Sequence, residues 1–110
     1  AFADAANAGY HAVRDVFIKT PVQGYLGGTS AVADLDYLPD LDKIKAPTRI
    51  IAAGDDPVTP IVRAEEIRDG IAGSQLMVID GQRHFSNVEV PDAFNTILRR
   101  GLDEMQKEAS

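Results

Sequence analysis

Two short apolar segments with a helix-sized segment between them constrain the fold of this chain most strongly. The first, residues 47–53 (PTRIIAA), is mostly apolar, is bounded by Pro and Gly, and is too short for a helix. The second, residues 75–79 (QLMVI), predicts another strand. Apolar runs of this length that do not alternate are typical of strands buried on both faces of a parallel sheet. The sequence therefore predicts an α/β fold built on a parallel strand–helix–strand unit.

The segment between the two strands predicts a helix that begins near Pro60. Proline at the first helical position, preceded by Thr59 as the cap, is a common helix start, and Gly73 is expected to end the helix. Its apolar residues share one face at helical spacing: Ile61, Ala64, Ile67 and Ile71. A crossover of this length joins two parallel strands into a right-handed unit.

Two helices and a connector are predicted before the first strand. Residues 1–20 are expected to be helical, either as one helix or as a short and a longer helix separated at Gly9, and the next helix begins at Pro21 with Thr20 as its cap. Residues 36–45 are polar and contain Pro39, which predicts a connector. The second helix is expected to bury a stripe of apolar side chains: Tyr25, Leu26, Val32 and Leu35.

One more helix is predicted after the second strand. It begins at Pro91, and residues 106–110 are expected to fray. Its apolar positions repeat every three or four residues: Phe94, Ile97, Leu98, Gly101, Leu102 and Met105. We therefore expect a helical segment over residues 1–45 and a strand–helix–strand–helix segment over residues 46–110.

The two predicted strands bring an acid and an imidazole to the same end of the sheet, where both strands finish. Asp55 and Asp56 follow the first strand, and His84 follows the second. Neighbouring strands lie about 4.8 Å apart, so we expect one of the two aspartates to contact His84. A carboxylate that hydrogen-bonds an imidazole fixes its tautomer and stabilises its protonated form, which is the acid–base half of a catalytic triad. Either aspartate satisfies this spacing.

The composition argues against several other functions. A net charge of −6 argues against a surface that binds nucleic acid, because binding phosphates needs clustered Lys and Arg, and it gives no attraction to anionic membranes. No apolar run approaches the roughly 20 residues of a membrane span. Without cysteine the chain has no disulfide or thiol chemistry, and we expect a cytoplasmic protein. The two histidines, His11 and His84, have no carboxylates at metal-ligand spacing, so neither a metal nor a cofactor is predicted.

The residues around the acid and the imidazole resemble a known family. The segments APTRIIAAGDDPVTP and AGSQLMVIDGQRHFSNVEVPDAFN resemble the C-terminal third of an α/β-hydrolase. The resemblance implies that Asp56 is the triad acid and His84 the triad histidine. Gly54 stands one place later than the family's usual glycine, which keeps Asp55 open as the acid.

A subfamily resemblance rests on shorter phrases. The segment TPVQGYLGGTSAVADLD resembles the end of the helical cap in 3-oxoadipate enol-lactonases and haloperoxidase-like hydrolases, and the phrase SNVE is similar to theirs. This resemblance implies a small-molecule lactone or ester as the substrate. It also implies that residues 1–45 correspond to the end of a cap region and its connector.

The family's nucleophile elbow, Gly-x-Ser-x-Gly, is absent from the sequence. Ser30 precedes Asp56 and His84 in the family's order, but Ala-Val follows it instead of x-Gly, so it is not predicted to be the nucleophile. Two strands alone also leave a sheet incomplete. The resemblance therefore implies a chain that is inactive alone and is completed by an N-terminal hydrolase half. The alternative is a truncated, non-catalytic relative that acts as an interaction module and self-associates through the sheet edge.

Overall fold

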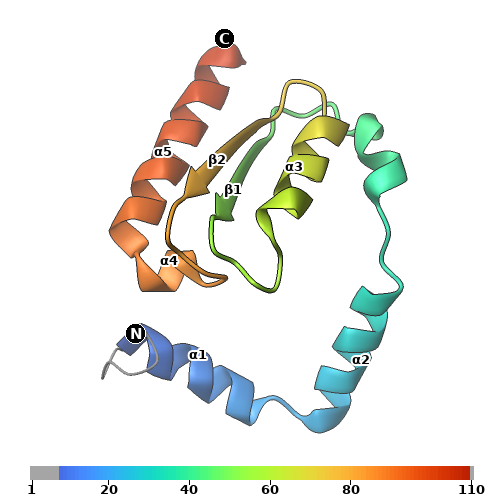
Figure 1. Ribbon diagram of the computed structural model, residues 1–110, viewed down its shortest axis with the longest axis vertical. Coiled ribbons are helices and arrows are strands. Elements are labelled where there is room, and N and C mark those ends of the chain that lie inside the picture. Colours follow the sequence, from blue (N-terminus) through green and yellow to red (C-terminus); the bar gives the residue numbers. More distant parts are fainter. Residues whose placement is uncertain (1–7, 110) are drawn as a thin grey trace. The chain divides into compact units, whose positions relative to one another are not determined.

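The computed structural model describes residues 8–109. The chain forms two compact units that divide between Tyr37 and Leu38 (Figure 1). The first contains α1 (Ala8–Lys19) and α2 (Val22–Ala33). The second contains the 3₁₀ helix η1 and the remaining strands and helices: η1 (Leu38–Lys43), β1 (Arg49–Ala53), α3 (Ile61–Gly70), β2 (Gln75–Ile79), α4 (Ser86–Glu89) and α5 (Pro91–Glu108).

The first unit contains two helices at the predicted positions, but its apolar side chains are not buried. The predicted stripe is exposed at all four of its positions: Tyr25, Leu26, Val32 and Leu35. The glycines of α2 likewise have no described atom within 4 Å of where a Cβ would lie. The expected burial is therefore wrong for this structure, because all four side chains are exposed. Residues 1–7 of the predicted first helix lie outside the described residues.

Local contacts join α1 to α2. The rings of Phe17 and Tyr25 meet edge to face, with their centroids 5.8 Å apart. Thr20 was expected to cap α2, but its hydroxyl donates to the carbonyl of Val16, at the end of α1, over 2.8 Å. Pro21 is instead the extended residue that precedes α2. Thr20 thus stabilises the end of one helix rather than the beginning of the next.

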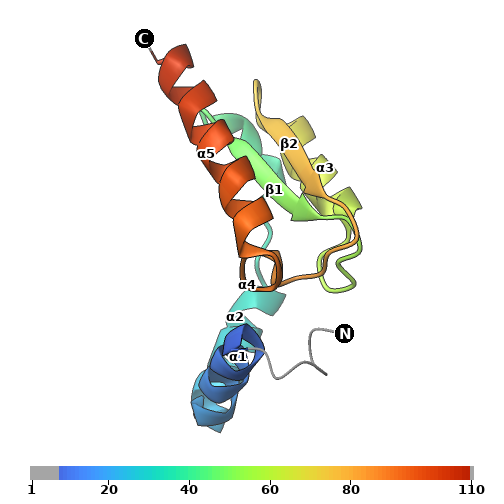
Figure 2. The ribbon, with the colours of Figure 1, turned by 90° about the vertical axis from the view of Figure 1, so that its left-hand side faces the viewer.

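A two-stranded parallel sheet forms the centre of the second unit. β1 pairs with β2 in a register that runs from Arg49 opposite Gln75 to Ala53 opposite Ile79. The sheet lies between α3 and α5 (Figures 1 and 2). These strands and their parallel pairing confirm the prediction from the two apolar segments.

The burial of the strands is less complete than the sequence predicts. Within the strands only the last residues, Ala53 and Ile79, are buried, and the buried apolar core of the described residues adds Ile71 after α3. The expectation of strands buried on both faces is therefore wrong for this chain. Each strand lies at an edge of the two-stranded sheet, so each keeps one open side.

Helix α3 begins and ends slightly differently from the prediction. Pro60 is the extended residue before the helix rather than its first residue, and Thr59 does not cap it. The helix ends at Gly70, and Gly73 lies in the turn before β2 with a positive φ of 75°. A positive φ is readily adopted only by glycine, so Gly73 belongs to the connection and not to the helix.

The connector before β1 packs against α3. Leu41 of η1 lies over Gly70, where a Cβ would come 2.7 Å from Leu41 Cδ1 and 2.8 Å from its Cβ. This close approach requires glycine, because even a methyl group would overlap the base of the leucine side chain. Residues 38–45 are therefore part of the second compact unit. The assignment of residues 1–45 to a cap region and its connector, and of residues 46–110 to the hydrolase core, stays a prediction.

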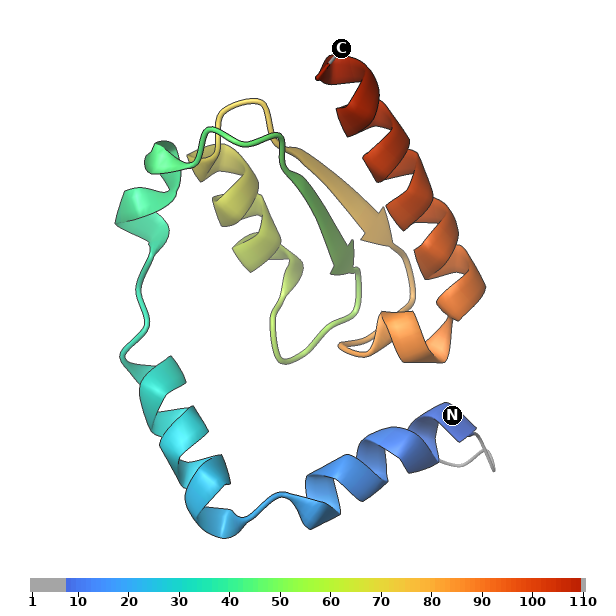
Figure 3. The same cartoon turned by 180° about the vertical axis from the view of Figure 1, so that it is seen from behind.

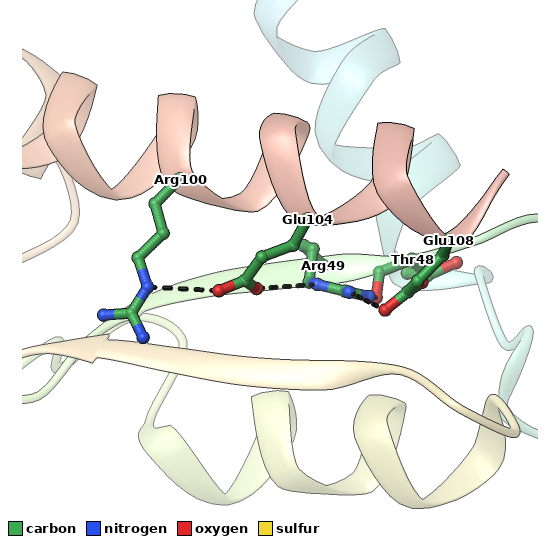
Figure 4. Close-up of polar contacts among 5 residues, drawn as sticks. All are labelled: Thr48, Arg49, Arg100, Glu104 and Glu108. Atoms are coloured by element: carbon green, nitrogen blue, oxygen red, sulfur yellow. Dashed lines mark hydrogen bonds and ion pairs between the residues drawn. The ribbon is translucent and has the colours of Figure 1, made fainter. Parts of the chain in front are cut away.

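Arg49 joins β1 to the C-terminal half of α5 (Figure 4). Its side chain is only 4% exposed, and its guanidinium lies 2.5 Å from a Glu108 carboxylate oxygen and 3.6 Å from one of Glu104. It also donates to the Thr48 carbonyl over 3.2 Å. Buried charges need such partners, because an unpaired ion in the interior is strongly destabilising.

Helix α5 is longer than expected and packs closely against the sheet. It continues to Glu108, so the expected fraying from residue 106 is wrong up to that point. Gly101 is buried, and a Cβ there would meet Met77 Cε at 3.1 Å and Arg49 Cγ at 3.4 Å. Among the described residues, no helix is long and apolar enough to cross a membrane.

We expect Gly70→Ala to lower the free energy of unfolding by about 1–3 kcal/mol, because the added methyl group overpacks against Leu41. Gly27→Ala is the matched control, since its added methyl group meets no atom within 4 Å. It removes a glycine from a helix interior and should raise helix stability by about 0.5–1 kcal/mol. Urea denaturation followed by circular dichroism measures both. Equal stability of the two variants would contradict the Gly70–Leu41 contact.

Candidate active site

The connections that follow β1 and β2 leave the sheet at the same end (Figure 3). Hydrogen bonding continues past the strands, with Gly54 N–H donating to the Ile79 carbonyl over 2.9 Å. The next residue, Asp55, donates its backbone N–H to the Gln82 carbonyl over 3.0 Å. These two bonds hold the connections together and place the residue after Asp55 opposite the residues that follow Gln82.

This arrangement brings Asp56 and His84 into contact. The Nδ1 atom of His84 lies 2.8 Å from Oδ2 of Asp56. Asp56 is buried, whereas the side chain of Asp55 is exposed. Of the two neighbouring aspartates, the structure therefore places Asp56 against the imidazole. Their catalytic roles stay a prediction.

Four donors surround the carboxylate of Asp56. Oδ1 accepts the backbone N–H groups of Val58 and Thr59, over 2.8 and 3.1 Å. Oδ2 accepts the hydroxyl of Thr59 over 2.7 Å, in addition to His84. Burial raises the pKa of Asp56, but the hydrogen bonds from Thr59, His84 and Val58 together hold it well below its usual value. Asp56 is therefore a carboxylate at neutral pH.

The charge of Asp56 determines the tautomer of His84. A carboxylate only accepts hydrogen bonds, so the Nδ1 atom of His84 carries the hydrogen. In the neutral ring, Nε2 is then the basic nitrogen. The side chain of His84 is 44% exposed, and its ring meets that of Phe85 edge to face with the centroids 5.3 Å apart. The pair thus combines a buried anion with an accessible imidazole, which is the arrangement of a general base and the acid that orients it.

A cavity of about 430 Å³ adjoins this pair. Asp56, Thr59 and His84 contribute to its lining, together with four consecutive residues of β1, residues 50–53. Successive residues of a strand point to opposite faces of a sheet. The cavity therefore extends along the free edge of β1 rather than over one face of the sheet.

Other candidate residues lie elsewhere. Ser30 is exposed within α2, in the other compact unit, and not on a turn between a strand and a helix. His11 lies in α1, where its ring meets that of Tyr10. Ser86 is buried at the start of α4 and lines the cavity two residues after His84. Across residues 8–109, no group of three or more metal-ligating side chains is placed to hold a metal ion.

Thr59 is the residue of this site that the sequence did not reveal. The pair Thr59-Pro60 predicted a helix cap, but Pro60 itself is the residue before α3, so Thr59 lies one place too early to cap it. Aspartate commonly accepts backbone N–H groups two and three residues ahead in a turn. The three-residue spacing from Asp56 to Thr59 was the signal in the sequence for this contact.

Solved structures of hydrolases match the fold that carries the acid–imidazole pair. A hydrolase from Pseudomonas aeruginosa PA01 matches with a TM-score of 0.84 and 33% identity, over 92% of this chain and 38% of its own. The enol-lactonase from Burkholderia xenovorans LB400 matches with a TM-score of 0.80 and 29% identity, over 86% and 36%. MGS-MChE2, an α/β-hydrolase from a metagenome of lagoon sediments, has a TM-score of 0.70 and 31% identity, over 86% and 45%. The predicted fold class is confirmed.

Curated relatives agree with these structures. 3-Oxoadipate enol-lactonase 1 of Acinetobacter baylyi is 43% identical over 87 residues, which are 79% of this chain and 32% of that protein. A putative carbamate hydrolase, RutD of Klebsiella pneumoniae, is 39% identical over 68% of this chain and 28% of its own. A proline iminopeptidase of Lactobacillus acidophilus is 40% identical over 64% and 24%. No protein-family model matches the chain.

The chain is therefore homologous to 3-oxoadipate enol-lactonases and related α/β-hydrolases, and its structure is consistent with the C-terminal portion of that fold. It spans about a third or less of the length of the curated relatives described above.

The lowered pKa of Asp56 predicts how stability depends on pH. The folded state holds the proton more weakly than an unfolded aspartate, whose pKa is about 3.9. The stabilisation from ionised Asp56 is therefore fully present above about pH 4 and is lost as the pH falls through its lower folded value. Urea denaturation from pH 7 to pH 2 should show wild type more stable than Asp56→Asn at neutral pH, with the difference shrinking below about pH 4. If the stability difference between wild type and Asp56→Asn stayed constant from pH 7 to pH 2, that result would contradict an ionised Asp56 in the folded state.

Proposed function

We propose that these 110 residues supply the acid and the histidine of a Ser-His-Asp triad in an α/β-hydrolase that acts on a small lactone or ester. The observation that carries the proposal is the 2.8 Å contact between Nδ1 of His84 and Oδ2 of Asp56, at the C-terminal end of the two strands. The names of two curated relatives and one structural neighbour, all enol-lactonases, support the lactone as the substrate class.

On this proposal each of the two residues has its own role. Nε2 of His84 takes the proton of a serine as its oxygen attacks the substrate carbonyl, and it then returns that proton to the leaving oxygen. Asp56 holds the Nδ1–H tautomer and stabilises the imidazolium that forms in between. The same imidazole then activates a water molecule that releases the acyl group from the serine.

The serine and the oxyanion hole come from residues outside this sequence, which contains no Gly-x-Ser-x-Gly. We place the missing hydrolase half along the free edge of β1, because the cavity beside Asp56 and His84 extends along that edge. On this proposal the 110 residues alone are inactive.

The first test joins this chain to the preceding part of the Acinetobacter baylyi enol-lactonase and measures hydrolysis of the enol-lactone or of p-nitrophenyl acetate. The joined protein should hydrolyse the substrate, and His84→Ala should lower kcat by about 10⁶-fold, because the general base is lost. His11→Ala is the control, since His11 lies in α1, and it should leave the rate unchanged.

Turnover that persists in His84→Ala would overturn the triad assignment. Absence of turnover, combined with self-association of the 110 residues in sedimentation, would favour the alternative of a non-catalytic interaction module. The free edge of β1 is the observation that supports this alternative.

The second test separates the two neighbouring aspartates. In the joined protein, Asp56→Asn should lower kcat by about 10⁴-fold with little change in KM, because the amide reverses the tautomer of His84. Asp55→Asn should retain the rate, since the Asp55 side chain is exposed and the residue contacts the other connection through its backbone N–H. A larger loss in Asp55→Asn would assign the acid to Asp55.

A further inference from the structure

Three side chains form a triangle at the C-terminal end of the two parallel strands. The hydroxyl of Thr59 lies 2.7 Å from Oδ2 of Asp56, and that same oxygen lies 2.8 Å from Nδ1 of His84. The third side of the triangle, from the hydroxyl of Thr59 to Nδ1 of His84, is 3.4 Å. All three residues line the same cavity.

The direction of each hydrogen bond follows from the carboxylate. Asp56 accepts only, so the single hydroxyl hydrogen of Thr59 is directed at Oδ2. The lone pairs of that hydroxyl then face the N–H of His84 at 3.4 Å. The imidazole N–H thus has a main acceptor in Asp56 and a weaker second acceptor in Thr59.

We propose that Thr59 is a positioning residue, whose hydroxyl holds the Asp56 carboxylate and the His84 ring in their mutual orientation. This inference rests on the proposed function, because it assigns a supporting residue to the same acid–base pair. Two backbone N–H groups hold Oδ1 of Asp56, but Oδ2 depends on side chains alone. Without the hydroxyl, the contact that Oδ2 keeps among the described residues is to a half-exposed imidazole from a different connection.

Substitutions at Thr59 separate the hydroxyl from the shape of the side chain. Thr59→Val keeps the size and removes the hydrogen bond, and Thr59→Ser keeps the hydroxyl and removes the methyl group. Thr96→Val is the matched control, because the hydroxyl of Thr96 donates to the Asp92 carbonyl on the exposed surface of α5. Thr59→Ala provides a second variant without the hydroxyl in case the valine variant does not fold.

The readout is nuclear magnetic resonance of the isotope-labelled 110-residue chain, and it does not depend on activity. At alkaline pH, where imidazoles are neutral, the ring nitrogen shifts report the ratio of the two tautomers of His84, with His11 as the internal reference. We expect Thr59→Val to lower the ratio of the Nδ1–H to the Nε2–H tautomer by about threefold to tenfold, the range of one ordinary hydrogen bond. The side-chain carboxyl shift of Asp56 should also show its pKa rising towards the usual value.

Thr59→Ser and Thr96→Val should both retain the wild-type tautomer ratio. A wild-type ratio in Thr59→Val or Thr59→Ala would overturn the proposal, and so would an equal loss in Thr59→Ser and Thr59→Val. These outcomes are independent of the joined-protein assay. Failure of that assay would refute the hydrolase role while leaving the hydrogen-bonded triangle in place.

Discussion

The parallel pairing of β1 with β2 determines where every polar residue of the candidate site can lie. It sends both connections to one end of the sheet, and the bonds from Gly54 and Asp55 extend the pairing beyond the strands. Asp55 uses its backbone N–H in this extension, and its side chain is exposed. The next residue, Asp56, is buried against His84. The backbone register, rather than any property of the two identical side chains, thus selects between neighbouring aspartates.

The second unit buries a charge at each end of β1, and the two charges are accommodated differently. Arg49, at the start of the strand, is held by Glu104 and Glu108 of α5, so its charge is neutralised by side chains that fasten the helix to the sheet. Asp56, beyond the end of the strand, is held mainly by neutral donors and by an imidazole. Only the second arrangement keeps an anion next to an accessible ring that can exchange a proton. This difference is why Asp56, and not Arg49, is the candidate for chemistry.

The sequence predicted those features that depend on spacing along the chain. Both strands, α3 and α5 follow from apolar runs and helical periodicity, and the approach of an aspartate to His84 follows from parallel pairing. Features that depend on the residue at which a helix begins, or on packing between elements, were not predictable in this way. Thr59 was expected to cap α3, but Pro60 occupies the position before the helix, and the hydroxyl of Thr59 donates to Asp56. The four-residue helix α4 is too short to show periodicity, and the apolar stripe of α2 predicted a burial that the described residues do not provide.

The cavity beside the acid–imidazole pair relates the incomplete sheet to the proposed chemistry. Four consecutive residues of β1 line it, so the space follows the unpaired edge of the strand. A further strand paired with β1 would occupy part of this space, since adjacent strands lie about 4.8 Å apart. On the proposed function, the missing hydrolase half that completes the sheet is then also the part of the enzyme that brings a nucleophile towards His84. On this proposal part of the 430 Å³ is space for protein rather than for substrate, and the contact between Asp56 and His84 forms within these 110 residues themselves.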